Sequence, residues 1–207
     1  MVGTGDTSRA EMALAGTVEA LVRLVEARDR RARAQTREVG TLAMRLGAAL
    51  GLDAATTRLV GLAARLRDVG MVALPDAILH KLGPLTTEEW ATMGTHAAVG
   101  AEIVGQIPAL RAVAPLVRAH HERWDGRGYP DQAVGEAIPL GARIVAVADA
   151  YVAMTMDRPY RAARSRAAAV AELRRCAGTQ FDPAAVEGLA AVLAGEGGDW
   201  PASVAAS

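Results

Sequence analysis

Apolar residues recur three and four positions apart along most of this 207-residue chain, which is the spacing of amphipathic helices. In the first such segment, residues 12–28, the residues Leu14, Val18 and Leu21 share one face. No segment shows the strict alternation of a half-buried strand. We therefore expect helices over about 12–28, 39–50, 54–69, 86–105, 109–123 and 140–155, a short turn of helix after Pro75, and two final helices ending near Leu193.

Polar residues at the predicted helix starts support these boundaries. Asp53, Ser165 and Asp182 each stand where an N-cap is expected. Two pairs, Ser8 with Glu11 and Thr86 with Glu89, have the spacing of a capping box. Pro108 and Pro139 each stand where a first helical turn tolerates proline. The glycine- and proline-rich stretch 125–139 is expected to be a loop.

These elements predict an all-α fold, a single-domain bundle of about 7–9 helices over residues 8–193, with flexible termini at 1–7 and 194–207. Hydrophobic residues make up 51% of the chain and aromatic residues only 3%, which favours helices packed through small side chains over a β-sandwich. The formal net charge of +0 gives no basic face for a nucleic acid duplex. Cys176 is the only cysteine, and neither a signal peptide nor a membrane span is recognisable, so we expect a cytoplasmic location and no membrane partner.

The chain has four histidines, and two of them, His120 and His121, are adjacent. A single histidine is more often a capped or solvated side chain than a ligand. That reading weakens for a pair followed at once by Glu122 and Asp125, since imidazole and carboxylate suit a transition metal. Asp149 interrupts an apolar run, where a buried carboxylate needs a partner; that partner could also be an arginine.

Asp68, His96, the pair 120–121 and Asp149 fall on successive predicted helices, from which side chains can converge in a bundle core. Alone, Asp68 could equally be a residue that ends a helix.

The string HHERWDGRGYP at 120–130 resembles the signature of the HD-GYP family of metal-dependent phosphohydrolases. The segments 66–96, 154–161 and 179–189 continue the similarity, which covers about residues 15–193. The resemblance implies a helical bundle around two or three metal ions, often iron or manganese, that hydrolyses cyclic di-GMP.

Carried over by position, the resemblance makes Asp68 a bridge between two metals. His96, His120 and His121 would complete one metal's ligands, and Asp149 would serve its neighbour. Asp68 and Asp149 are thus the catalytic candidates. We expect the substrate, cyclic di-GMP or a related nucleotide, to be contacted by Arg67, Arg123, Gly128, Tyr129, Pro130 and Arg158.

The family pattern is broken at four positions. Arg67 replaces the histidine of the HD dipeptide, and Gln35 replaces another histidine ligand. Met71 and Val152 replace a lysine and an aspartate. Because a guanidinium has no lone pair to donate, Arg67 cannot bind the first metal. We hypothesise that it bridges Asp68 and Asp149 instead, the alternative being that it turns out to solvent.

One divalent metal, iron or manganese, is therefore expected, with the second site lost and hydrolysis weak or absent. A non-catalytic module that binds cyclic di-GMP, or a protein partner through the GYP loop, is the alternative function. Self-association as a homodimer through the first helix is a third possibility.

Overall fold

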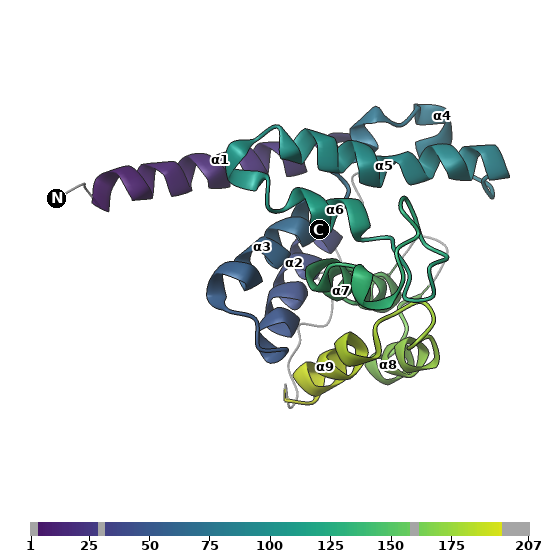
Figure 1. Cartoon of the computed structure of the whole chain (residues 1–207). Coiled ribbons are helices and arrows are strands. Elements are labelled where there is room, and N and C mark those ends of the chain that lie inside the picture. Colours follow the sequence, from purple (N-terminus) through teal and green to yellow (C-terminus); the bar gives the residue numbers. More distant parts are fainter. Residues whose placement is uncertain (1–3, 29–31, 158–161, 196–207) are drawn as a thin grey trace.

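The computed structural model describes residues 4–28, 32–157 and 162–195 (Figure 1). Within these ranges the chain forms nine α-helices and three short 3-10 helices, with no strand, so the all-α prediction is confirmed. The elements are α1 (Thr4–Arg28), α2 (Ala32–Ala49), α3 (Ala54–Leu66), η1 (Val69–Ala73), α4 (Asp76–Leu79), α5 (Thr87–Gly105), η2 (Pro108–Leu110), α6 (Ala114–Ala119), η3 (Gly135–Ala137), α7 (Leu140–Thr155), α8 (Arg166–Arg175) and α9 (Pro183–Ala194). In this part of the chain no helix is long and apolar enough to cross a bilayer.

Most predicted helix starts are confirmed by their hydrogen bonds. Asp53 accepts bonds from the backbone N–H groups of Ala55 and Thr56. Thr86 and Glu89 form the expected reciprocal capping box. The side chains of Ser165 and Asp182 cap α8 and α9, and α7 follows Pro139 as predicted.

Three boundaries differ from the sequence prediction. The first helix begins at Thr4, so Ser8 and Glu11 lie inside it and form no start. The third helix ends at Leu66, and the chain tightens into η1 before Gly70. The expected helix 109–123 is divided into η2 and α6, because Pro115 has no N–H to continue a helix and stands in the first turn of α6.

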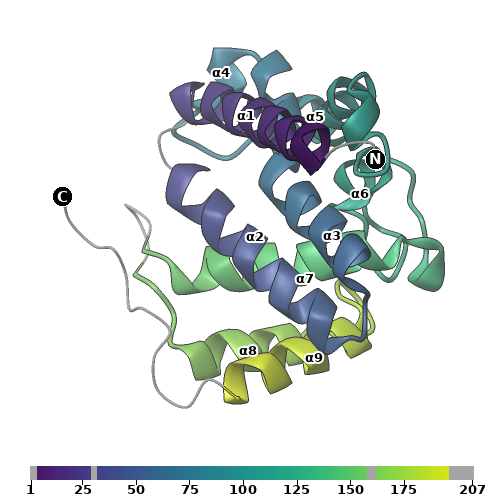
Figure 2. The ribbon, with the colours of Figure 1, turned by 90° about the vertical axis from the view of Figure 1, so that its left-hand side faces the viewer.

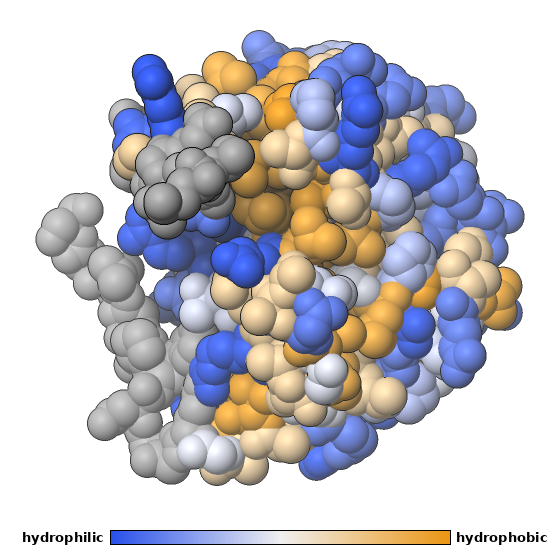
Figure 3. Space-filling model, turned by 60° about the vertical axis from the view of Figure 1, so that its left-hand side comes forward, coloured by the Kyte–Doolittle hydropathy of each residue, from blue (hydrophilic) through white to orange (hydrophobic). Residues whose placement is uncertain are grey.

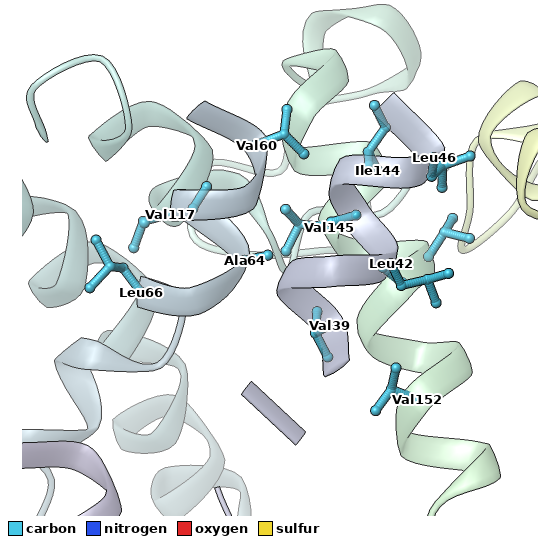
Figure 4. Packing of buried hydrophobic residues seen from close by; sticks show 14 of the residues in the cluster. Val39, Leu42, Leu46, Val60, Ala64, Leu66, Val117, Ile144, Val145 and Val152 are labelled. Atoms are coloured by element: carbon cyan, nitrogen blue, oxygen red, sulfur yellow. The ribbon is translucent and has the colours of Figure 1, made fainter. Parts of the chain in front are cut away.

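The helices lie at three levels, with α1, α4 and α5 above, α2, α3 and α7 in the middle, and α8 and α9 below (Figures 1 and 2). The middle level holds the centre of the hydrophobic core. Figure 4 shows Leu42 and Leu46 of α2, Val60 of α3 and Ile144 of α7 pointing into it. Glycine lets two of these helices approach closely: a Cβ on Gly61 of α3 would lie 2.5 Å from Cγ of Met44 on α2.

The first helix packs on the domain only along its second half. Val18, Val22 and Val25 are buried, whereas Met12 is 65% exposed on the half that extends beyond the body (Figure 1). The face turned toward the viewer in Figure 3 carries a band of hydrophobic surface between hydrophilic margins. Self-association through this helix stays a prediction.

Asp53→Ala should lower the free energy of unfolding by about 1 kcal/mol, because two backbone N–H groups of α3 lose their side-chain acceptor. Urea denaturation measures the change. Asp53→Ser keeps an acceptor and is the control; equal losses in both variants would contradict the capping role.

Candidate metal centre

Three histidines meet where α6 packs against α5. His96 lies on α5. His120 stands at the end of α6 and His121 follows it, and α6 packs against α5. One ligand atom from each histidine lies within 4.8 Å of the others. His96 and His120 are buried, and His121 is partly buried. The predicted meeting of these three residues is therefore seen in the structure.

Backbone carbonyls fix which nitrogen of two histidines is free. Nδ1 of His96 lies 2.7 Å from the carbonyl oxygen of Met93, and Nδ1 of His120 lies 2.6 Å from that of Val117. Because a carbonyl oxygen only accepts, each Nδ1 carries the proton and each Nε2 keeps its lone pair. The two Nε2 atoms face each other at 3.4 Å. Two facing lone pairs repel unless a cation lies near them, so this donor set fits a metal ion.

The surroundings keep the imidazoles of His120 and His121 neutral, as metal binding requires. Burial, and then the neighbouring His121 and His96, hold the pKa of His120 well below its usual value. Burial and His96 likewise lower the pKa of His121 to about 4. Both rings therefore present lone pairs at neutral pH.

The guanidinium of Arg67 lies between two carboxylates. Its Nη2 is 3.1 Å from Oδ2 of Asp68 and 2.9 Å from Oδ1 of Asp149, and its Nη1 donates to the carbonyl oxygen of Ala64 at 2.8 Å. The side chain is 3% exposed, so the alternative of a solvent-facing arginine is wrong. Burial alone would lower the pKa of Arg67, but Asp149 and Asp68 raise it above its ordinary value. The hypothesised bridge is thus present.

Asp68 and Asp149 lie outside this group of mutually close ligand atoms, although Asp68 interacts electrostatically with His121. Among the described residues, the ligand atoms that lie within 4.8 Å of one another are those of the three histidines, without Asp68 or Asp149. Asp149 also accepts a 3.3 Å hydrogen bond from Nε2 of Gln35, the residue that stands where the HD-GYP family has a histidine ligand. Gln35 and Arg67 together hold Asp149 by hydrogen bonds.

The GYP loop is fastened by Glu122, whose buried carboxylate accepts the N–H groups of Asp131 at 2.7 Å and Ala133 at 3.1 Å. Arg118 binds the carboxylate of Asp131 through two hydrogen bonds of 2.7 Å. A Cβ on Gly128 would lie 2.4 Å from the backbone nitrogen of Arg123, so only glycine fits there.

Tyr129 lies over the histidines, with ring centroids 4.9 Å from His121 and 6.3 Å from His96. Its peptide bond to Pro130 is cis. Burial, and then Asp68 and Asp149, raise the pKa of Tyr129, so its phenol keeps its proton.

The chain matches the HD domain family over residues 19–185. The chain belongs to the HD domain family. It is 41% identical over 175 residues to the cyclic di-GMP phosphodiesterase response regulator RpfG of Xanthomonas campestris pv. campestris, covering 84% of this chain and 46% of that protein. It is 37% identical to the 3'3'-cGAMP-specific phosphodiesterase 2 of Vibrio cholerae, covering 81% and 32%.

A crystal structure of a cyclic GMP-AMP specific phosphodiesterase of V. cholerae, V-cGAP3, has the same fold with a TM-score of 0.68 at 21% identity, covering 86% of this chain and 49% of that one. The resemblance to the HD-GYP family is thereby confirmed. This HD domain spans about a third to a half of the length of these relatives.

The expected substrate contacts of this HD domain stay predictions. Arg123 is engaged by Asp125 through bonds of 3.0 and 2.7 Å, and Arg67 is buried between the aspartates. Arg158 lies outside the described residues. Gly128, Tyr129 and Pro130 lie in the expected loop, and the ring of Tyr129 lies beside His121.

Two supporting residues were missed at the sequence level. Glu122 was noted only as part of the motif, although a carboxylate beside two ligand candidates is itself a signal for a buried support. Arg28 ends α1 and donates to the carbonyl oxygens of Met71 at 3.2 Å and Leu74 at 2.8 Å. It thereby fixes η1, whose Gly70 lies so close to α5 that a Cβ would be 2.0 Å from the carbonyl oxygen of His96.

Glu122→Ala should lower the free energy of unfolding by about 1–3 kcal/mol, because the half-buried N–H groups of Asp131 and Ala133 lose their acceptor. Urea denaturation gives the loss, and titration with Mn²⁺ should show weaker binding, since the loop lies over the histidines. Glu136→Ala removes an exposed acid from the same loop and serves as the control; equal effects of the two variants would exclude the support by Glu122.

The metal-free protein should lose stability as the pH falls from about 6.5 toward 4. An unfolded histidine titrates near 6.5, whereas His121 in the fold titrates at about 4 and His120 also below its usual value. The unfolded state therefore binds more protons in this window, at a cost of up to about 1.4 kcal/mol per pH unit for each histidine.

Urea titrations in EDTA at a series of pH values measure this slope. The slope should be smaller in His121→Gln. A slope that His121→Gln leaves unaltered would contradict the assignment.

Proposed function

We propose that this HD domain binds a cyclic dinucleotide at a centre for one divalent metal, and that it hydrolyses this ligand weakly or not at all. The relatives named for cyclic di-GMP and cyclic GMP-AMP support the class of ligand. The three histidines, with one ligand atom each within 4.8 Å of the others, and the facing Nε2 atoms of His96 and His120 support a single metal site.

His96, His120 and His121 would hold the metal, iron or manganese. Bound there, such an ion supplies Lewis-acid chemistry toward a phosphate oxygen. Around it, the chain contributes a protonated phenol at Tyr129 that can donate a hydrogen bond, and two carboxylates already engaged by Arg67. The loop held by Glu122 would exclude water from one side.

The contact of Arg67 with both Asp68 and Asp149 carries the proposal of reduced hydrolysis. A second cation in the family position would need these carboxylates as ligands. Arg67 brings a permanent positive charge to the same place, and two cations a few ångströms apart repel strongly in a site of low dielectric. With one metal, the attacking and the leaving oxygen of a phosphodiester are not both stabilised.

A non-catalytic signalling module is the second candidate. The loop 121–133 is held by the chain's own groups, through Glu122 and the Arg118–Asp131 pair. Its shape therefore does not depend on a complete two-metal centre. It could present the same surface to cyclic di-GMP or to a protein partner without cleaving anything.

The double variant Arg67→His with Gln35→His should raise the metal content from about one toward two ions per chain, because it supplies two imidazole ligands and removes the competing charge. Metal analysis after loading with Mn²⁺ or Fe²⁺ measures this content. Arg67→Met with Gln35→Met removes the same polar groups without adding ligands and is the matched control.

Turnover of cyclic di-GMP by the unaltered protein should stay far below about 1 per second, the lower end of ordinary enzymatic rates. Two metal ions per unaltered chain, or turnover at that rate, would overturn the proposal of a reduced site. An unaltered protein that binds neither metal nor cyclic di-GMP would remove the ligand assignment as well.

A further inference from the structure

Helix α5 packs on the domain along one stripe of its surface. The buried members of this stripe include Ala97, Gly100, Ala101 and Val104. One turn before Ala97, Gly94 continues it and contacts the loop: a Cβ there would lie 3.5 Å from Cδ2 of Tyr129. Trp90 stands two turns before Ala97, so it faces the same side of α5 as these residues.

At Trp90 the body of the domain no longer covers the stripe. The side chain is 57% exposed, and it is the only aromatic among the large hydrophobic residues exposed in the described ranges. The indole is a wide flat apolar surface that solvent reaches, at the end of a stripe whose other members are buried or half-buried.

Trp90 lies on the solvent side of the metal centre. The ring of Tyr129 contacts both His121 and the stripe at Gly94, and Trp90 is one turn farther out. Along α5, six residues separate Trp90 from His96, which is about 9 Å of helix. Trp90 therefore lies one turn of α5 beyond Gly94, whose neighbour Tyr129 lies beside His121.

The backbone that carries Trp90 is firmly held. The carboxylate of Glu89 accepts the N–H of Thr86 at 2.7 Å and pairs with Lys81 at 2.5 Å. These contacts fix the first turn of α5 and the loop before it. The indole is thus presented from an ordered segment, which lowers the entropic cost of binding to it.

We propose that Trp90 stacks on a nucleobase of the nucleotide whose phosphate reaches the three histidines; this rests on the proposed function. In a nucleotide the base lies across the sugar from the phosphate, so a phosphate near the histidines sends its base outward along the site. An indole face suits any of the bases, because stacking uses the π surface and not the hydrogen-bonding edge.

The test compares GMP with ribose 5-phosphate, which carries the same phosphate and sugar but no base. Calorimetric titration of the Mn²⁺-loaded protein should show that Trp90→Ala weakens GMP binding about tenfold and leaves ribose 5-phosphate unchanged. Trp90→Phe keeps a stacking ring and should retain most of the affinity. Met12→Ala removes another exposed apolar side chain, on α1, and should alter neither.

Full GMP affinity in Trp90→Ala, or equal weakening of GMP and ribose 5-phosphate, would overturn the stacking role while the proposed function stands. If Trp90→Ala does not fold, Trp90→Phe and Trp90→Leu decide by the same comparison, since only the former can stack. An unaltered protein that binds neither GMP nor cyclic di-GMP would remove both proposals.

Discussion

The guanidinium of Arg67 joins the end of α3 to the middle of α7 through Asp68 and Asp149, and the rest of the site is arranged around this contact. A buried positive charge is costly unless it is paired and fully hydrogen-bonded, and here a backbone carbonyl and two carboxylates meet that need. Removing the arginine would leave the two carboxylates facing each other. The pairing therefore keeps both aspartates committed to the protein itself.

With Asp68 paired to Arg67, the proposed metal ligands are the three imidazoles. A divalent ion bound by three imidazoles would keep its full charge, with the cationic Arg67 close by. Such a centre favours an anionic ligand over a neutral one. The proposed binding of a phosphate-containing ligand with slow cleavage is in keeping with this arrangement.

Much of this arrangement could be predicted from the sequence, because the motif residues are local or evenly dispersed. The pair 120–121 and His96 follow from residue chemistry and their dispersal over the helices, whereas the bridging by Arg67 is hypothesised from the resemblance to the HD-GYP family. The division at Pro115 was missed because apolar periodicity continues across it, although the backbone hydrogen bonds do not. The local pattern around Ser8 predicts a helix cap, but α1 begins before it, at Thr4. The exposure of Trp90 depends on where the neighbouring elements end, which no periodicity reveals.

Glu122 follows directly after the two histidines, and its carboxylate holds the loop at Asp131 and Ala133. The position of this loop and the position of the imidazoles are consequently coupled. By thermodynamic linkage, a molecule that binds the ordered loop and an ion that binds at the histidines raise each other's affinity by the same factor. An occupant of the outer loop surface could thus adjust how tightly an ion binds at the histidines without ever touching it.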